Sequence, residues 1–183
     1  MKKVVRNFAI AIASMLFVGS VTVADAQSRN KVRKLEYNSR YNYEVSTVAV
    51  GVDGTKVVKV WGYGKKAEDA MRNAKELGVA CALFRGFPAG SNGSAAPTPA
   101  IISDPNADTK YEEYFTKFFE PGGKYLQYVN YSSDAVPTDR VKVNKKTYKV
   151  GVVLSIAYDE LRKEMEREGI ARKLNSGFYS DNQ

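Results

Sequence analysis

The stretch that decides the fold is Thr147-Tyr-Lys-Val-Gly-Val-Val-Leu-Ser-Ile-Ala-Tyr158. Its apolar side chains recur at every second position, at Tyr148, Val150, Val152, Leu154, Ile156 and Tyr158. Because successive side chains of a β-strand point to opposite faces, this alternation places all six on one face. We therefore predict a long strand with one face against the core, and the rest of the chain is interpreted around it.

Residues 41–63 predict a hairpin that can pair with this strand. The segments 41–50 and 56–63 are rich in Tyr, Val and Thr, residues that favour strands. Between them stands Val52-Asp53-Gly54-Thr55. An Asp-Gly pair between two such segments is a strong indication of a tight turn.

A helix is predicted next, over residues 65–84. Its apolar residues recur every three or four positions, at Ala67, Ala70, Ala74, Leu77, Cys81 and Phe84. Since most of these side chains are small, the helix can lie close against a sheet. Residues 86–107 contain four of the six prolines and predict a long loop, which in a compact domain is either functional or mobile.

The rest of the chain predicts a short aromatic helix, two strands and a closing helix. The capping box Thr109-Lys110-Tyr111-Glu112 opens the short helix, and Pro121-Gly122-Gly123 ends it. A strand over 124–132 and the long strand at 147–158 follow. A charged helix from Asp159 to about Leu174 closes the domain, with Leu161, Met165 and Leu174 inward and its Glu and Arg residues forming a solvated face.

These elements predict the fold class α+β. We expect a small antiparallel sheet of about four strands with two or three helices packed mainly on one face, in the order β-β-α-α-β-β-α. Residues 41–183 form this single domain, which includes the proline-rich loop at 86–107.

The amino-terminal residues predict export. Lys2, Lys3 and Arg6 precede an apolar run over 8–23, and Ala24-Asp25-Ala26 has the small-x-small pattern that signal peptidase reads. We expect a signal peptide over 1–26, a flexible arm over 27–40 and a periplasmic or extracellular protein, with no transmembrane segment after cleavage. Lipoprotein anchoring is excluded because no cysteine lies near the cleavage point.

Composition argues against most enzyme classes. The 183 residues include no histidine and one cysteine, which excludes His-dependent triads, His-based zinc sites and an internal disulfide. We therefore predict no enzyme, no catalytic residues, no metal and no cofactor. The net charge of +8 would suggest nucleic acid in a cytoplasmic protein. In an exported one it points to anionic envelope components or to solubility alone, so we expect no nucleic acid.

Two short motifs suggest ligand sites, but each also has a purely structural explanation. Gly62-Tyr63-Gly64-Lys65-Lys66-Ala67 fits the dinucleotide pattern G-x-G-x-x-A, but its strand belongs to a hairpin, and a tight strand-to-helix turn is the alternative. Asp104, Asn106 and Asp108 have the spacing of a calcium loop. Thr109 and Phe115 occupy the positions where that loop needs Gly and Glu, so whether the three bind a cation stays open.

Aromatic residues provide the candidates for a partner surface. Tyr125 and Tyr131 fall on one face of the strand predicted at 124–132, and Trp61 and Tyr63 share one face of the hairpin's second strand. Rings with a polar edge bind peptides or sugars. The alternative is that these rings belong to the core. Cys81 is interpreted as a core residue, since no histidine can activate its thiol.

The strand ending in Gly62-Tyr63-Gly64, followed by a helix with Ala67, Ala70, Ala74 and Ala82, resembles the N-terminal domain of flagellar assembly protein T and related small bacterial envelope lipoproteins. The resemblance covers about residues 41–85 and 145–160. This chain departs from the pattern because it lacks the lipobox cysteine of the lipoproteins and carries the proline-rich insertion. The resemblance implies a structural or assembly role without catalysis.

We therefore expect a non-enzymatic secreted or periplasmic binding or assembly module of the bacterial cell envelope, with another envelope protein as its partner. The alternative is a glycan-binding module that uses exposed Tyr and Trp side chains. A hydrolase that relies on Asp and Glu alone is a third hypothesis, but no pair of carboxylates stands out for that chemistry.

Overall fold

The computed structural model describes residues 44–132, 139–144 and 147–174. These described residues belong to one compact unit. The expected signal peptide and arm, at 1–26 and 27–40, lie outside the described residues.

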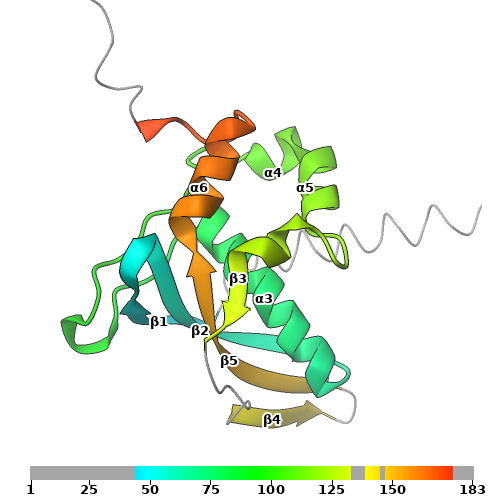
Figure 1. The fold of residues 1–183 in the computed structure, drawn as a ribbon. Helices are drawn as coiled ribbons and strands as arrows, with labels where there is room; N and C mark the ends of the chain where they lie inside the picture. Colours follow the sequence, from blue (N-terminus) through cyan, green and yellow to red (C-terminus); the bar gives the residue numbers. More distant parts are fainter. Residues whose placement is uncertain (1–43, 133–138, 145–146, 175–183) are drawn as a thin grey trace, which may run out of the picture. The chain divides into compact units, whose positions relative to one another are not determined.

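The described residues form an α+β fold, which confirms the predicted class. The strands are β1 (Val45–Val50), β2 (Thr55–Gly64), β3 (Val129–Tyr131), β4 (Asp139–Asn144) and β5 (Thr147–Ala157). The helices are α3 (Ala67–Phe84), α4 (Ala107–Lys110), α5 (Glu112–Phe118) and α6 (Tyr158–Arg167), with 3-10 turns η1 (Val52–Gly54), η2 (Ser91–Gly93) and η3 (Lys124–Tyr128). The strands make one antiparallel sheet in the order β1-β2-β5-β3, and β4 also pairs with β5 (Figure 1).

The predicted hairpin and the predicted long strand form the centre of the sheet. Asp53 and Gly54 have φ of 64° and 72°, as both central residues of a type I′ hairpin turn require. Strand β2 then pairs along its whole length with β5, from Thr55 opposite Ala157 to Gly64 opposite Tyr148.

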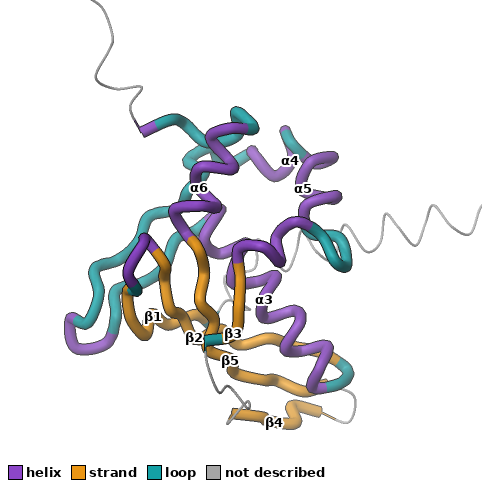
Figure 2. The backbone as a smooth tube through the Cα atoms, in the orientation of Figure 1, coloured by secondary structure: helices purple, strands orange, loops and turns teal. Residues whose placement is uncertain are grey.

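The core lies between one face of this sheet and α3, which crosses it (Figure 2). The alternating residues of β2 and β5 on that face are almost fully buried: Val58, Val60, Val150, Val152, Leu154 and Ile156. On α3, the facing positions are small, at Ala70, Ala74 and Gly78. Small residues let the helix backbone come close to the strands.

The Gly62–Ala67 motif is explained by this close packing. A Cβ on Gly62 would lie 1.9 Å from the carbonyl oxygen of Ala70, and one on Gly64 would lie 2.4 Å from the Ala70 nitrogen. The strand before α3 is antiparallel to its neighbours, whereas a dinucleotide fold needs a parallel βαβ unit.

The strand predicted over 124–132 is wrong for its first half. Residues 124–128 form η3, and only 129–131 pair with β5. The chain turns because the Leu126 amide donates to the Gly123 carbonyl at 3.2 Å. The Tyr125 ring then packs on Phe119, with 5.6 Å between centroids. Strand β4, at 139–144, was not anticipated, so the predicted order of elements is matched only roughly.

The closing helix is shorter than predicted. Gly169 adopts φ of +70°, and the Ile170 amide donates to the Met165 carbonyl at 2.9 Å, which is the hydrogen-bond pattern of a helix stop. Leu161 and Met165 are buried as expected, but Leu174 lies beyond the stop and is 69% exposed.

The 86–107 loop packs on the domain and ends α3. Phe87 pairs with Thr98, and the amides of Ile101 and Ile102 donate to the carbonyls of Ala82 and Leu83. These bonds satisfy carbonyls at the helix end that would otherwise lack partners. The described helices include none that is both long and apolar enough to cross a membrane.

Candidate functional site

The face of the sheet opposite α3 is the candidate binding surface. We call it the open face, and it comprises Lys59, Trp61, Tyr63, Asp139, Val141 and Lys149. These residues alternate along β2, β4 and β5 with those that point to the other face. The β2 side chains that point toward α3, Val58 and Val60, are buried, whereas Trp61 and Tyr63 stay half-exposed. Strand β2 thus presents two aromatic side chains on the open face, between its paired neighbours β1 and β5.

Trp61 lies at the centre of the open face. Its ring covers Gly151 of β5, where a Cβ would lie 3.2 Å from the indole. The ammonium nitrogens of Lys59 and Lys149 lie 5.1 Å and 4.6 Å from the indole centroid, and Lys149 also lies 5.8 Å from the Tyr63 ring. These are cation–π distances. The glycine and the two lysines therefore hold the indole in one orientation.

Carboxylates balance the two lysines. Lys59 pairs with Asp139, and Lys149 pairs with Glu44 just before β1. The hydrogen bond from Lys149 to Glu44 is the main reason why the pKa of Lys149 is raised. The open face is therefore aromatic at its centre with ion pairs beside the rings, an arrangement that suits a partner with both apolar and charged groups.

The four sequence candidates do not come together. Trp61 and Tyr63 share the open face, as predicted. Tyr125 is 2% exposed, so it is a core residue and cannot contribute to a surface. Tyr131 is 38% exposed but belongs to the opposite face, because it pairs with the core residue Leu154, and its ring lies 4.0 Å from the Lys75 ammonium of α3.

No family model matches the chain, and no curated protein or solved structure is similar to it.

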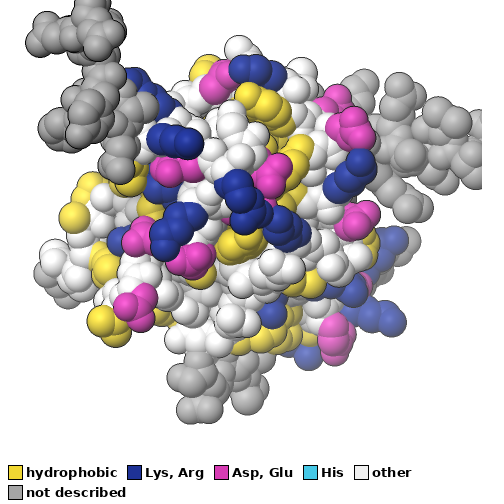
Figure 3. Space-filling model, turned by 45° about the horizontal axis from the view of Figure 1, so that its top comes forward, with side chains coloured by type: hydrophobic (Ala, Val, Ile, Leu, Met, Phe, Trp, Pro, Cys, Tyr) yellow, Lys and Arg dark blue, Asp and Glu magenta, His cyan; other side chains and the backbone are white. Residues whose placement is uncertain are grey.

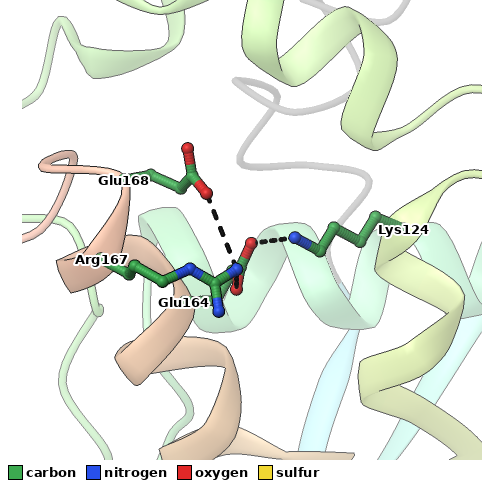
Figure 4. A network of polar contacts seen from close by, with 4 residues as sticks. All are labelled: Lys124, Glu164, Arg167 and Glu168. Carbon is green, nitrogen blue, oxygen red and sulfur yellow. Dashed lines mark hydrogen bonds and ion pairs between the residues drawn. The ribbon is translucent and has the colours of Figure 1, made fainter.

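A buried carboxylate in α6 was missed by the sequence reasoning. Glu164 was expected on a solvated face, but it is 3% exposed and pairs with Lys124 and Arg167, and Arg167 also reaches toward Glu168 (Figure 4). Its position next to Met165, three residues after Leu161, could have indicated that it turns toward the core.

The environment of Glu164 favours its ionised form. Burial by itself would raise the pKa of Glu164, but the hydrogen bond and charge of Lys124, with help from Arg167 and Tyr128, hold that pKa below its usual value. Burial, followed by the charge of Glu164, raises the pKa of Tyr128 to about 12. These groups join η3 to α6 and fix the helices relative to one another.

Asp104, Asp108 and Cys81 have local structural environments. Asp104 accepts a hydrogen bond from the Asn106 amide at 2.9 Å just before α4, and Asp108, within the first turn of α4, accepts one from the Thr109 amide at 2.8 Å. Across the described ranges, no three His, Cys, Asp or Glu side chains gather as metal ligands would. Burial raises the pKa of Cys81 to about 12, which keeps its thiol protonated at neutral pH.

Proposed function

We propose that this protein is an exported, non-enzymatic binding or assembly module of the bacterial cell envelope, and that it binds another envelope protein through the open face. The observation that supports the proposal best is the pair Trp61 and Tyr63. They lie two residues apart on a strand that is paired on both sides, and both remain half-exposed.

Such a pair is suited to protein recognition. Trp and Tyr dominate binding energies because they bury a large area with few rotatable bonds. The Trp61 ring is already oriented by Gly151 and the two lysines, so binding costs little side-chain entropy. Lys59 and Lys149, with their carboxylate partners, can set the orientation of a partner at the rim.

The resemblance to envelope assembly proteins agrees with this proposal, as does the positive charge of the chain. Glycan binding is the alternative, because a sugar ring can stack on the same Trp61 and Tyr63 rings. Both readings place the interaction on the open face, and they differ in the chemical nature of the partner.

Cross-linking in intact cells, followed by affinity purification and mass spectrometry, tests the proposal. We expect a protein neighbour that is lost with Trp61→Ala and kept with Tyr131→Ala, a matched ring removal on the other face. Thermal melting of both variants shows whether each stays folded, and Lys149→Ala tests the same surface without removing a ring. A neighbour that all three variants retain would contradict the proposal, whereas Trp61-dependent binding on a glycan array without a protein neighbour would favour the glycan alternative.

A further inference from the structure

A cavity of about 640 Å³ lies between the hairpin, the 86–107 loop and α6. Its walls include Lys56 of β2, the loop residues Pro97 and Pro99, and Tyr158, Arg162 and Glu166 of α6. It is separate from the open face, since Lys56 alternates with Lys59 and Trp61 along β2 and points to the side of α6. Its volume is in the range of sites for small ligands.

Two basic groups are gathered around one ring in this cavity. The Lys56 ammonium lies 5.8 Å from the centroid of Tyr158, and the Arg162 guanidinium also lies 5.8 Å from it. Tyr158 is itself fixed, because its hydroxyl donates to the Pro99 carbonyl at 2.7 Å. Lys56 and Arg162 therefore both line the cavity beside the Tyr158 ring.

These two charges are poorly neutralised. Among the described residues, Lys56 has no carboxylate partner, and the one ion pair of Arg162 is to Glu166 at 3.7 Å, longer than a hydrogen bond. Lys163, another basic residue of the wall, is different because it pairs with Glu160 at 2.7 Å. Lys56 and Arg162 thus leave room for an anionic group of a ligand.

The cavity wall also holds a carboxylate that can accept a hydrogen bond. The Glu166 side chain lines the cavity and is 19% exposed, whereas its Oε1 is buried, lies 3.7 Å from Arg162 Nη1 and accepts no hydrogen bond from a described donor. A carboxylate without a donor is costly, so a ligand hydroxyl that this side chain turns toward gains affinity. The second carboxylate of the cavity wall, Asp159, is turned against the hairpin turn, where a Cβ on Gly54 would lie 1.8 Å from it.

We propose that this cavity binds an acidic saccharide, that is, a hydroxylated ring that carries one carboxylate or phosphate group. The anionic group lies between Lys56 and Arg162, since a guanidinium and an ammonium bind both kinds of anion. A ring hydroxyl donates to Glu166, and the apolar face of the ring packs against Pro97 and Pro99. A hydroxyl is favoured over an ammonium because the wall already holds four basic and two acidic side chains. Figure 3 shows basic and acidic side chains close to one another over the face that it presents.

Calorimetric titration of the full chain tests the proposal with probes that differ in one feature each. Glucuronate and glucose 6-phosphate carry both the acid and the hydroxyls, glucose lacks the acid, and acetate and inorganic phosphate lack the ring. We expect at least one acidic sugar to bind about tenfold or more tightly than glucose, acetate and phosphate, and the preferred sugar identifies the acid group. Alanine, a zwitterion, is expected to bind no better than acetate.

Variants connect that binding to the cavity. Lys56→Gln and Arg162→Gln each remove one positive charge and are expected to weaken the acidic sugar about tenfold. Lys117→Gln is the matched control. Lys117 is an exposed lysine of α5 that pairs with Glu113 and is not part of the cavity wall, so this variant should leave the affinity for the acidic sugar unchanged. Because Lys56 is half-exposed, Lys56→Gln should fold normally. It therefore still tests the proposal if Arg162→Gln fails to fold.

Three results would overturn the proposal: no binding of any probe at about 10 mM, binding of glucose as tight as that of both acidic sugars, or acidic-sugar binding that both cavity variants leave intact. Acetate, phosphate or alanine binding as tightly as the sugars would also contradict it, since the ring would then contribute nothing. Trp61→Ala should leave this binding unchanged, so failure here and failure of the proposed partner surface are distinguishable.

Discussion

At the scale of single residues, stability and the proposed function depend on a few positions where the neighbouring atoms restrict which side chain fits. Gly62 and Gly64 have no room for a side chain, because the backbone of α3 lies where a Cβ would be. Glu164 is tolerated in the core because Lys124, Arg167 and Tyr128 surround its carboxylate. Trp61 keeps its orientation because Gly151 lets the indole lie flat on β5.

Gly62→Ala should destabilise the protein strongly. The new Cβ would lie 1.9 Å from the Ala70 carbonyl, so α3 must move away from the sheet, and we expect a loss of about 3 kcal/mol. Urea unfolding measures this loss. Gly122→Ala is the comparison, because Gly122 has φ of +83° but open space around it, and it should lose only about 1 kcal/mol. Equal losses would show that α3 does not pack as closely as described.

Glu164→Gln should lower the free energy of unfolding at neutral pH by about 2 kcal/mol, because two charged hydrogen-bond partners lose their carboxylate. The folded pKa of Glu164 lies below its unfolded value, so the carboxylate stabilises the fold above about pH 4.3 and stops doing so as the pH falls through the folded value. The difference between wild type and variant should therefore shrink in acid. Urea unfolding at several pH values checks this, and a constant difference would contradict it.

At the scale of elements, local signals decide where helices and strands start, and tertiary contacts decide some of their lengths. The Asp53-Gly54 turn forms as its residues predict. The segment 124–128 has residues typical of a strand, yet it forms a 3-10 turn because Tyr125 is drawn into the core against Phe119. The end of α6 near Gly169 could have been predicted from the sequence, since glycine is the residue that most often ends helices.

Gly169→Ala should lower the free energy of unfolding by about 1 kcal/mol, because alanine adopts the φ of +70° at that position only with strain. The space around Gly169 is open, so no steric clash adds to the loss. Thermal or urea unfolding gives the value, with the exposed neighbour variant Glu168→Ala as control. If Gly169→Ala is as stable as wild type, the helix stop does not depend on the left-handed residue.

At the scale of the whole molecule, β5 connects the parts. It pairs with β2 along its length on one side and with β3 and β4 on the other, and its core face meets α3. The sheet thereby has a buried face and an open face that we propose for recognition, while the 86–107 loop and α6 line a separate cavity. The two proposed binding sites can therefore be changed independently.

Hydrogen exchange should be slowest in β2, β5 and α3, because their amides are paired at the centre of the sheet or covered by the core. The amides of β4 and of the outer edge of β1 should exchange faster, since each strand has a neighbour on only one side. Mass spectrometry of exchanged, digested protein resolves these segments. Fast exchange in β5 would contradict a sheet centred on this strand.

The sequence by itself determined the hairpin, the long strand, the first helix and the α+β class, because these depend on periodicity and turn residues that act locally. It also indicated Trp61 and Tyr63 as candidates for a partner surface, because residues two positions apart on one strand lie on the same face. Only the tertiary structure decided that Tyr125 is buried, that Tyr131 lies on the other face and that Glu164 is paired inside the protein. It alone brought Lys56, Arg162 and Glu166 together, because their proximity depends on how β2, the loop and α6 pack, and no local pattern records contacts between residues about a hundred positions apart.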